Sequence, residues 1–135
     1  MAFVQDRWRD DPDILERSLE SAGRLLMSGM FVSGGWDAFK APAQRAPKAA
    51  AIGIPFPELA TRANGAVMLV CGIALGAGVA VQPAAAVLAM SLVPTTIAGH
   101  AFWKEDPKAR TGQRIHFLKN LAMLGGLLVL LSKRR

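Results

Sequence analysis

Two short groups of polar residues in the last third of the chain carry the side chains best suited to chemistry. Each group has members at positions i, i+3 and i+4, a spacing that places all three side chains on one face of a helix. Imidazole and ammonium groups can donate hydrogen bonds to a ring carbonyl, and an indole can stack on the ring. One interpretation of this pattern is a pocket for a quinone-like or other small amphipathic ligand. The two groups are His100, Trp103 and Lys104, and His116, Lys119 and Asn120.

Further polar residues are expected at the same membrane level. The two groups flank a short polar loop, and Asp37 and Lys40 close an earlier apolar segment, with Asp37 as the carboxylate placed to offset the surrounding cations. A charged group near lipid is costly unless it is partnered, so such a set needs either mutual pairing or a ligand. The complete candidate ligand-binding cluster is Asp37, Lys40, His100, Trp103, Lys104, Arg114, His116, Lys119 and Asn120.

Two other interpretations of this cluster remain open. Tryptophan, lysine and histidine commonly anchor helices at membrane interfaces, so the cluster could serve anchoring and inter-helix hydrogen bonding alone. His100 and His116 could instead ligate a b-type haem, but two imidazoles would have to face each other within a bundle, and both are expected at its edge. Quinone is therefore the possible cofactor, haem is not expected, and no residue is singled out as catalytic.

Other kinds of site find no support in the sequence. No motif orders the serines and histidines into a hydrolytic triad, and neither a Gly-rich phosphate loop nor zinc-ligand spacing is present, so no metal is expected. Cys71 is the single cysteine, which excludes an internal disulfide and predicts an inert thiol in an apolar span. The net charge is +6, but no stretch of basic residues alternates with aromatic residues on a soluble element. Nucleic-acid binding is therefore not expected.

The elements that must position the cluster are predicted from an uncharged segment. Residues 63–103 contain no Asp, Glu, Lys or Arg, and a bilayer core takes about 20 apolar residues per helix. Gln82-Pro83 lies near the middle, and proline is tolerated in the first turn of a helix. We therefore predict a hairpin of two spans, about 59–81 and 83–103. Pro94 should kink the second span, with Thr95 and Thr96 satisfying backbone groups nearby.

Two further spans complete the predicted fold, at about 22–39 and 115–132. The fold class is all-α, a four-transmembrane-helix bundle with an N-terminal interfacial helical segment. The predicted domains are a charged segment at 1–21, a membrane domain at 22–132 and a basic tail at 133–135. Four spans place both termini on one face, where 7 basic residues oppose 9 on the other. A difference this small does not determine the orientation.

Small residues recur at helical spacing on two of the predicted spans. They let helix backbones approach closely in lipid, where no hydrophobic force drives association. We favour contacts inside the bundle over a dimer seam, because four short helices must first pack with one another. The candidate packing residues are Gly65, Gly72, Gly76, Ala122 and Gly126.

Two stretches of the sequence resemble the DoxX family over about residues 20–132. His100-Ala-Phe-Trp103, followed after the polar loop by residues 113–128, is similar to the closing signature of that family, and residues 24–40 are similar to its opening helix. Many members carry an acidic residue early in the second helix, where the nearest polar residue here is Asn64. The N-terminal residues 1–20 lie outside the resemblance.

The resemblance implies a four-helix protein of the bacterial cytoplasmic membrane. It further implies a subunit or accessory of a redox system, in quinone-linked oxidation of sulfur or thiol compounds or in defence against oxidative stress. The implied partners are the lipid bilayer and a soluble thiol-redox or oxygen-detoxifying enzyme. A homo-oligomer stays open from the small residues noted above. Whether the protein is itself an enzyme stays open; if it is, it would be an oxidoreductase subunit acting with quinone and a partner protein. The alternative is a non-catalytic membrane scaffold or a bundle for small-solute permeation.

Overall fold

The computed structural model describes residues 12–133, which form an all-α bundle without strands in that range. This confirms the predicted fold class. The described residues leave out two parts of the predicted domains: residues 1–11 of the N-terminal segment and residues 134–135 of the basic tail. The helices within the described range are α2 (Pro12–Lys40), α3 (Ala46–Ala51), α4 (Pro57–Ala77), α5 (Val81–Gly99) and α6 (Pro107–Ser132), with short 3₁₀ helices η2 (Pro42–Gln44) and η3 (Phe102–Lys104).

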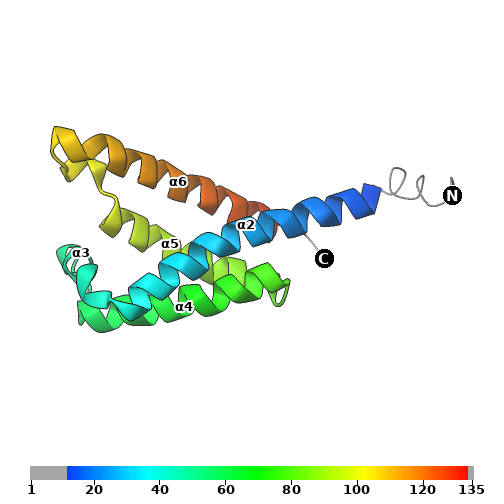
Figure 1. Cartoon of the computed structure of the whole chain (residues 1–135), viewed down its shortest axis with the longest axis horizontal. Coiled ribbons are helices and arrows are strands. Elements are labelled where there is room, and N and C mark those ends of the chain that lie inside the picture. Colours follow the sequence, from blue (N-terminus) through cyan, green and yellow to red (C-terminus); the bar gives the residue numbers. More distant parts are fainter. Residues whose placement is uncertain (1–11, 134–135) are drawn as a thin grey trace, which may run out of the picture.

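Figure 1 shows how the long helices are arranged. Helices α2 and α4 lie side by side, α5 runs back from the α4–α5 turn, and α6 diverges from α2 towards the α5–α6 connection. We call the end of the bundle that holds residues 12–24, 77–84 and 128–133 the terminal end. The opposite end, with residues 37–62 and 95–119, is the loop end.

Three of the described helices are long and apolar enough to cross a membrane: α4, α5 continued through η3 to Lys104, and α6. Helix α2 is longer than any of them but is not in this set. Its first half carries charged residues such as Glu16 and Glu20, and its second half contains Asp37. The fourth span, and the limits of the membrane domain, therefore stay predictions.

The turn between α4 and α5 falls at Gly78–Ala80, earlier than the Gln82-Pro83 turn predicted from the sequence. Gly78 has a φ of 73°, which glycine adopts without steric cost. Its N–H donates to the carbonyl of Leu75, and that of Val79 donates to Ala74, which is the pattern of a Schellman motif. Pro83 consequently lies in the first turn of α5, where its missing N–H leaves no helical bond unmade.

The α5–α6 connection also differs from the prediction. Helix α5 ends at Gly99, so His100, Trp103 and Lys104 do not share one face of a continuous helix. Helix α6 begins at Pro107 instead of near 115, because Asp106 caps it: its Oδ1 accepts the N–H of Ala109 at 3.0 Å. The predicted polar loop at 104–114 is therefore largely the first two turns of α6.

Glycines of α4 set the close approach of α2 and α4. A Cβ added at Gly65 would lie 2.6 Å from the backbone N of Phe39, and one at Gly72 would lie 2.9 Å from Phe31 Cβ. A Cβ at Gly76 would meet Ser28 Oγ at 2.6 Å. Gly65, Gly72 and Gly76 thus all face α2, and they bring its backbone within direct contact.

The two candidate packing residues of α6 are placed differently. A Cβ at Gly126 would lie 2.7 Å from Met27 Sδ, the flexible part of an α2 side chain, so this position contacts α2 near the terminal end. Ala122 is exposed in the described chain and contacts no neighbouring helix closely enough to be buried. Of the two positions, Gly126 alone therefore packs α6 against another helix.

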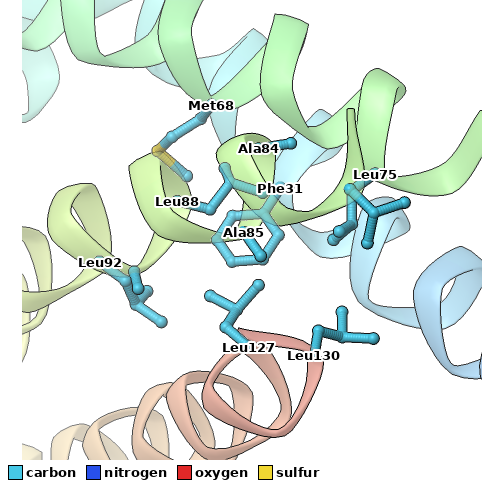
Figure 2. Close-up of a cluster of buried hydrophobic side chains, with 11 residues drawn as sticks. Phe31, Met68, Leu75, Ala84, Ala85, Leu88, Leu92, Leu127 and Leu130 are labelled. Atoms are coloured by element: carbon cyan, nitrogen blue, oxygen red, sulfur yellow. The ribbon is translucent and has the colours of Figure 1, made fainter. Parts of the chain in front are cut away.

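The hydrophobic core lies where α2, α4, α5 and α6 meet, nearer the terminal end. Phe31 points from α2 towards Leu127 of α6 and Leu88 of α5, and all three side chains are fully buried (Figure 2). Fully burying a large apolar side chain contributes about 1.5–3 kcal/mol where water is the alternative; in lipid, close packing supplies the attraction instead. The core therefore joins the four long helices nearer the terminal end.

Candidate functional site

The imidazoles of His100 and His116 stack on each other at the loop end. Their ring centroids lie 5.2 Å apart, and the ring planes are inclined by 25°. His100 follows the last residue of α5 and is half-buried, whereas His116 lies in the third turn of α6 and is exposed. The two residues that the sequence places 16 positions apart therefore form one site across the α5–α6 connection.

Two residues of α6 hydrogen-bond to this pair. The Nδ1 of His100 lies 2.8 Å from Oε1 of Gln113, and the Nδ1 of His116 lies 3.5 Å from Nζ of Lys119. Gln113 and Lys119 are each three positions from His116, so all three side chains share one face of α6. Sequence reasoning placed Lys119 in the cluster and missed Gln113, although its i, i+3 spacing to His116 was readable.

Trp103 belongs to an aromatic trio with Phe102 and Phe117. Its ring packs edge-to-face on Phe102 at 5.2 Å and on Phe117 at 5.7 Å, and Phe102 packs in the same manner on Phe117 at 5.4 Å. Edge-to-face pairs at such distances contribute about 0.5–1.5 kcal/mol each beyond their burial. The trio joins η3 to α6.

Asn120 serves a different contact from the one predicted for it. It is buried and donates from Nδ2 to Thr96 Oγ1 at 3.0 Å, while Thr96 donates to the Leu92 carbonyl at 2.6 Å. Thr95 likewise donates to the carbonyl of Ser91 at 2.8 Å, so both threonines satisfy backbone groups as expected. Asn120 therefore bonds α6 to α5 inside the bundle.

Lys119 is the one charged member of the predicted cluster with a hydrogen bond to a histidine in the described chain, and the other charged members make none. Asp37 is exposed and pairs with Arg45 at 3.9 Å, and Arg45 also donates to the carbonyl of Gly34 at 3.0 Å. The side chains of Lys40, Lys104 and Arg114 are exposed and make no hydrogen bond or ion pair to another described residue. Asp37 thus offsets the charge of Arg45 in the α2–α4 connection, and the basic residues near the histidines lack a carboxylate partner of their own.

A second polar network, missed by sequence reasoning, joins α4 to α5. Asn64 donates from Nδ2 to Thr95 Oγ1 at 3.2 Å, and its Oδ1 accepts the hydroxyl of Ser91. Both atoms of the amide are therefore partnered inside a pair of helices that the sequence marks as apolar. At the same end of α5, Lys48 of α3 donates to the carbonyl of Gly99 at 2.9 Å. These bonds hold the end of α5 that presents His100.

The terminal end carries a cluster of charges that the sequence analysis did not place. Lys133 Nζ contacts Glu16 at 3.1 Å and Glu20 at 2.9 Å, and Arg24 contacts Glu20 at 3.0 Å. The hydrogen bond from Lys133 lowers the pKa of the Glu20 carboxyl, and the same bond raises the pKa of Lys133. Gln82 of α5 donates to the carbonyl of Lys133. Lys133 therefore links the end of α6 to both α2 and α5.

A groove of about 240 Å³ lies between these charges. Its walls include Asp13, Arg17, Val81 and Leu130 beside the paired residues. The carboxylates of Glu16 and Glu20 already form ion pairs with Lys133 and Arg24. The groove therefore presents no arrangement of described residues that selects a ligand. The ion pairs hold the terminal ends of α2 and α6 together.

Metal and thiol chemistry have no assembled site in the described residues. No group of three or more His, Cys, Asp or Glu side chains lies close enough there to hold a metal ion. In the stacked histidine pair the ring faces oppose each other, whereas a bis-imidazole haem site needs a nitrogen of each ring pointing at the iron. Cys71 is half-buried and packs against the hydrophobic core.

Comparison with known proteins gives one family. Neither the curated proteins nor the solved structures include a match to this chain. The model of the DoxX family matches residues 19–101, from the first turns of α2 through α4 and α5 to the residue after His100. The match includes the opening segment noted in the sequence. It reaches the first two residues of the closing signature and ends before residues 113–128, which form the rest of it. Because it spans more than half of the 135 residues, this membrane protein with its apolar helices belongs to the DoxX family.

Proposed function

We propose that this protein is a membrane subunit or accessory of a redox system, and that its histidine pair binds the polar head of a quinone-type ligand. The observation that carries the proposal is the stacking of His100 on His116, with Gln113 and Lys119 hydrogen-bonded to the two rings. Membership of the DoxX family supports the membrane setting. No residue is assigned a catalytic role, because the pair offers binding and proton-exchange groups but no reactive centre.

The position of the pair suits an amphipathic ligand. It lies where the apolar length of α5 gives way to the polar connection, so the imidazoles can meet the polar end of an amphipathic molecule. Ile97, Ile115 and Leu118 leave large apolar surfaces exposed on the same two helices. A hydrocarbon tail can lie along that surface in the membrane while the ring oxygens reach the imidazoles.

The lone cysteine limits what this chain can contribute to thiol oxidation. Cys71 packs against the core, remote in sequence from the loop end, and a disulfide exchange reaction needs an accessible thiolate. We therefore propose that reactive thiols, if they feed this system, belong to a partner protein. Such a partner would dock near the loop end, where the exposed Lys104 and Arg114 offer positive charge.

Equilibrium binding of a short-chain benzoquinone to the protein in lipid nanodiscs tests the proposal. His116→Ala should weaken binding at least fivefold, because one ring and its hydrogen-bonding nitrogens are lost, about 1 kcal/mol of interaction. Val129→Ala is a matched control, since Val129 is also exposed on α6 but lies at the terminal end. If the unaltered protein binds no quinone, or if both variants bind it equally well, the histidine pair is not a quinone site and the anchoring interpretation of the cluster stands.

A further inference from the structure

Positive charge is concentrated at the loop end of the described chain. The residue ranges that define the loop end hold nine Lys or Arg and four Asp or Glu, whereas those of the terminal end hold three of each kind. At the terminal end, Arg24 and Lys133 already form ion pairs with glutamates of α2. Most of the cations that lack a partner in the described chain therefore lie at the loop end.

Two of these cations, Lys40 of α2 and Arg62 of α4, lie at the same level of the bundle. A Cβ added at Gly65 of α4 would lie 2.6 Å from the backbone N of Phe39 of α2, so these two positions face each other. Lys40 follows Phe39 directly, and Arg62 precedes Gly65 by three residues, about 4.5 Å along the helix axis. The two positive charges therefore lie on adjacent helices within about one helical turn of each other.

Neither cation is neutralised by the part of the chain that the structure describes. Both side chains are exposed and form no hydrogen bond or ion pair with another described residue. Of the nearby carboxylates, Asp37 contacts Arg45, and Glu58, one turn before Arg62, has no ion pair with a described residue. Arg62 is the sixth residue of an apolar helix, about 7.5 Å from its start, and a charge near lipid is costly unless it is partnered. An anionic group of the membrane can supply the missing partner.

Large apolar side chains lie beside both cations. On α2, Trp36 and Phe39 precede Lys40, and their rings stack with centroids 6.4 Å apart. Trp36 is half exposed, and Leu59 of α4 is 68% exposed. Trp36 lies four positions before Lys40, and Leu59 lies three positions before Arg62, so each cation shares a helix face with a large exposed apolar residue.

This face continues along the outer side of α4. Val70 and Ile73 are exposed eleven positions beyond Leu59 and Arg62, and eleven residues make about three helical turns. Helix α5 packs on the other side of α4, where Asn64 bonds to residues of α5. The outer face of α2 and α4 is therefore an apolar surface with two unpaired cations at its loop end.

We propose that this outer face binds an acidic phospholipid, with the lipid phosphate between Lys40 and Arg62 and the acyl chains along the exposed apolar residues. A phosphodiester offers acceptor oxygens to both the ammonium and the guanidinium group. A zwitterionic lipid also carries an ammonium group, which the two cations repel, so an acidic head group matches the face better. This partner is separate from the ligand proposed for the histidines, and neither proposal depends on the other.

Native mass spectrometry of the whole protein, released from nanodiscs with equal amounts of phosphatidylglycerol and phosphatidylcholine, identifies the lipid that stays bound. The unaltered protein should retain about fivefold more phosphatidylglycerol, which corresponds to about 1 kcal/mol. Lys40→Gln and Arg62→Gln should each lower this ratio to about twofold, and the double variant should bring it close to one. Lys108→Gln is the matched control, because it removes the same charge from an exposed position at the start of α6, and it should keep the ratio near fivefold.

Arg62→Lys separates charge from packing. It preserves the positive charge, so it should retain a ratio above about threefold; a loss as large as that of Arg62→Gln overturns the inference. A ratio near one for the unaltered protein overturns it as well. An equal loss in Lys108→Gln would assign the preference to the net charge of the loop end, and two copies packed through this face would exclude lipid and leave no difference between the variants. Either result refutes a lipid site at Lys40 and Arg62.

Discussion

Gly65→Ala should separate α2 from α4, because the glycine lies where the two backbones touch. An added Cβ would be 2.6 Å from the N of Phe39 and 2.7 Å from the carbonyl oxygen of Gly35. Both neighbours are main-chain atoms of α2, which cannot rotate aside as a flexible side chain can. Ordinary contacts begin at about 3.5 Å, so the helices must move apart locally by nearly 1 Å.

The cost of that movement follows from how much contact it loosens. A gap of 0.5–1 Å forfeits about a quarter to a half of the dispersion energy of each affected atom pair. The contact between α2 and α4 also includes Gly72 and Gly76, where an added Cβ would lie 2.9 Å and 2.6 Å from the nearest α2 atom. Overpacking a tight interior typically costs about 1–3 kcal/mol, and with backbone on both sides we expect Gly65→Ala to fall near 3 kcal/mol.

Reversible unfolding of the purified protein in mixed micelles measures this free energy. Gly125→Ala is the matched control, because Gly125 lies within α6 and an added Cβ there meets nothing within 4 Å. Alanine favours a helix over glycine by about 1 kcal/mol, so the control should be neutral or slightly more stable. Equal unfolding free energies for the two variants would refute the close approach of α2 and α4.

Three further predictions concern the other contacts. A double-mutant cycle of Asn120→Ala and Thr96→Ala should give a coupling of about 0.6–1.7 kcal/mol in unfolding, the range for hydrogen bonds between membrane helices, and additive losses would exclude the bond. The stabilisation from the Glu20–Lys133 pair should be present at neutral pH. Because the pKa of Glu20 is lowered, it should be lost as pH falls below about 4, and because the pKa of Lys133 is raised, it should be lost again as pH rises above about 10.5. Unfolding of Lys133→Met across pH checks this, since its deficit should vanish at both extremes. Cys71→Ala should leave quinone binding, and any redox activity with a partner, within about threefold, because its thiol packs against the core; a hundredfold loss of activity would show that the thiol reacts.

The paired histidines also show why the loop end could not be completed from sequence. The residues three positions from His116 on α6 can be read from the sequence alone. Lys119 was identified in this way, and Gln113 could have been. The placement of His100 against His116 depends instead on where α5 ends. Gly99 is the last helical residue, and the chain then reverses through η3, which turns His100 towards α6.

The sequence by itself determined the helical fold and its apolar elements. A long uncharged segment in a small chain must be helical if it lies in lipid, because only a helix satisfies all of its backbone groups within the segment. Glycine spacing on α4 likewise marked the face that meets α2, since close approach needs small residues wherever the partner lies. Even the start of α6 had a local signal in Asp106-Pro107, an N-cap followed by proline, although hydropathy alone placed it later.

Only the tertiary structure decided which polar groups became partners. Asp37 pairs with Arg45 and not with the cations of residues 104–119, Asn64 bonds across to Ser91, and Lys133 reaches back to the start of α2. These pairings join residues between 8 and 117 positions apart. They depend on how the helices pack, which no local sequence pattern specifies. Charge and hydrogen-bonding capacity are written in each residue type, but the distance between two groups, which sets their interaction energy, exists only after the helices have packed.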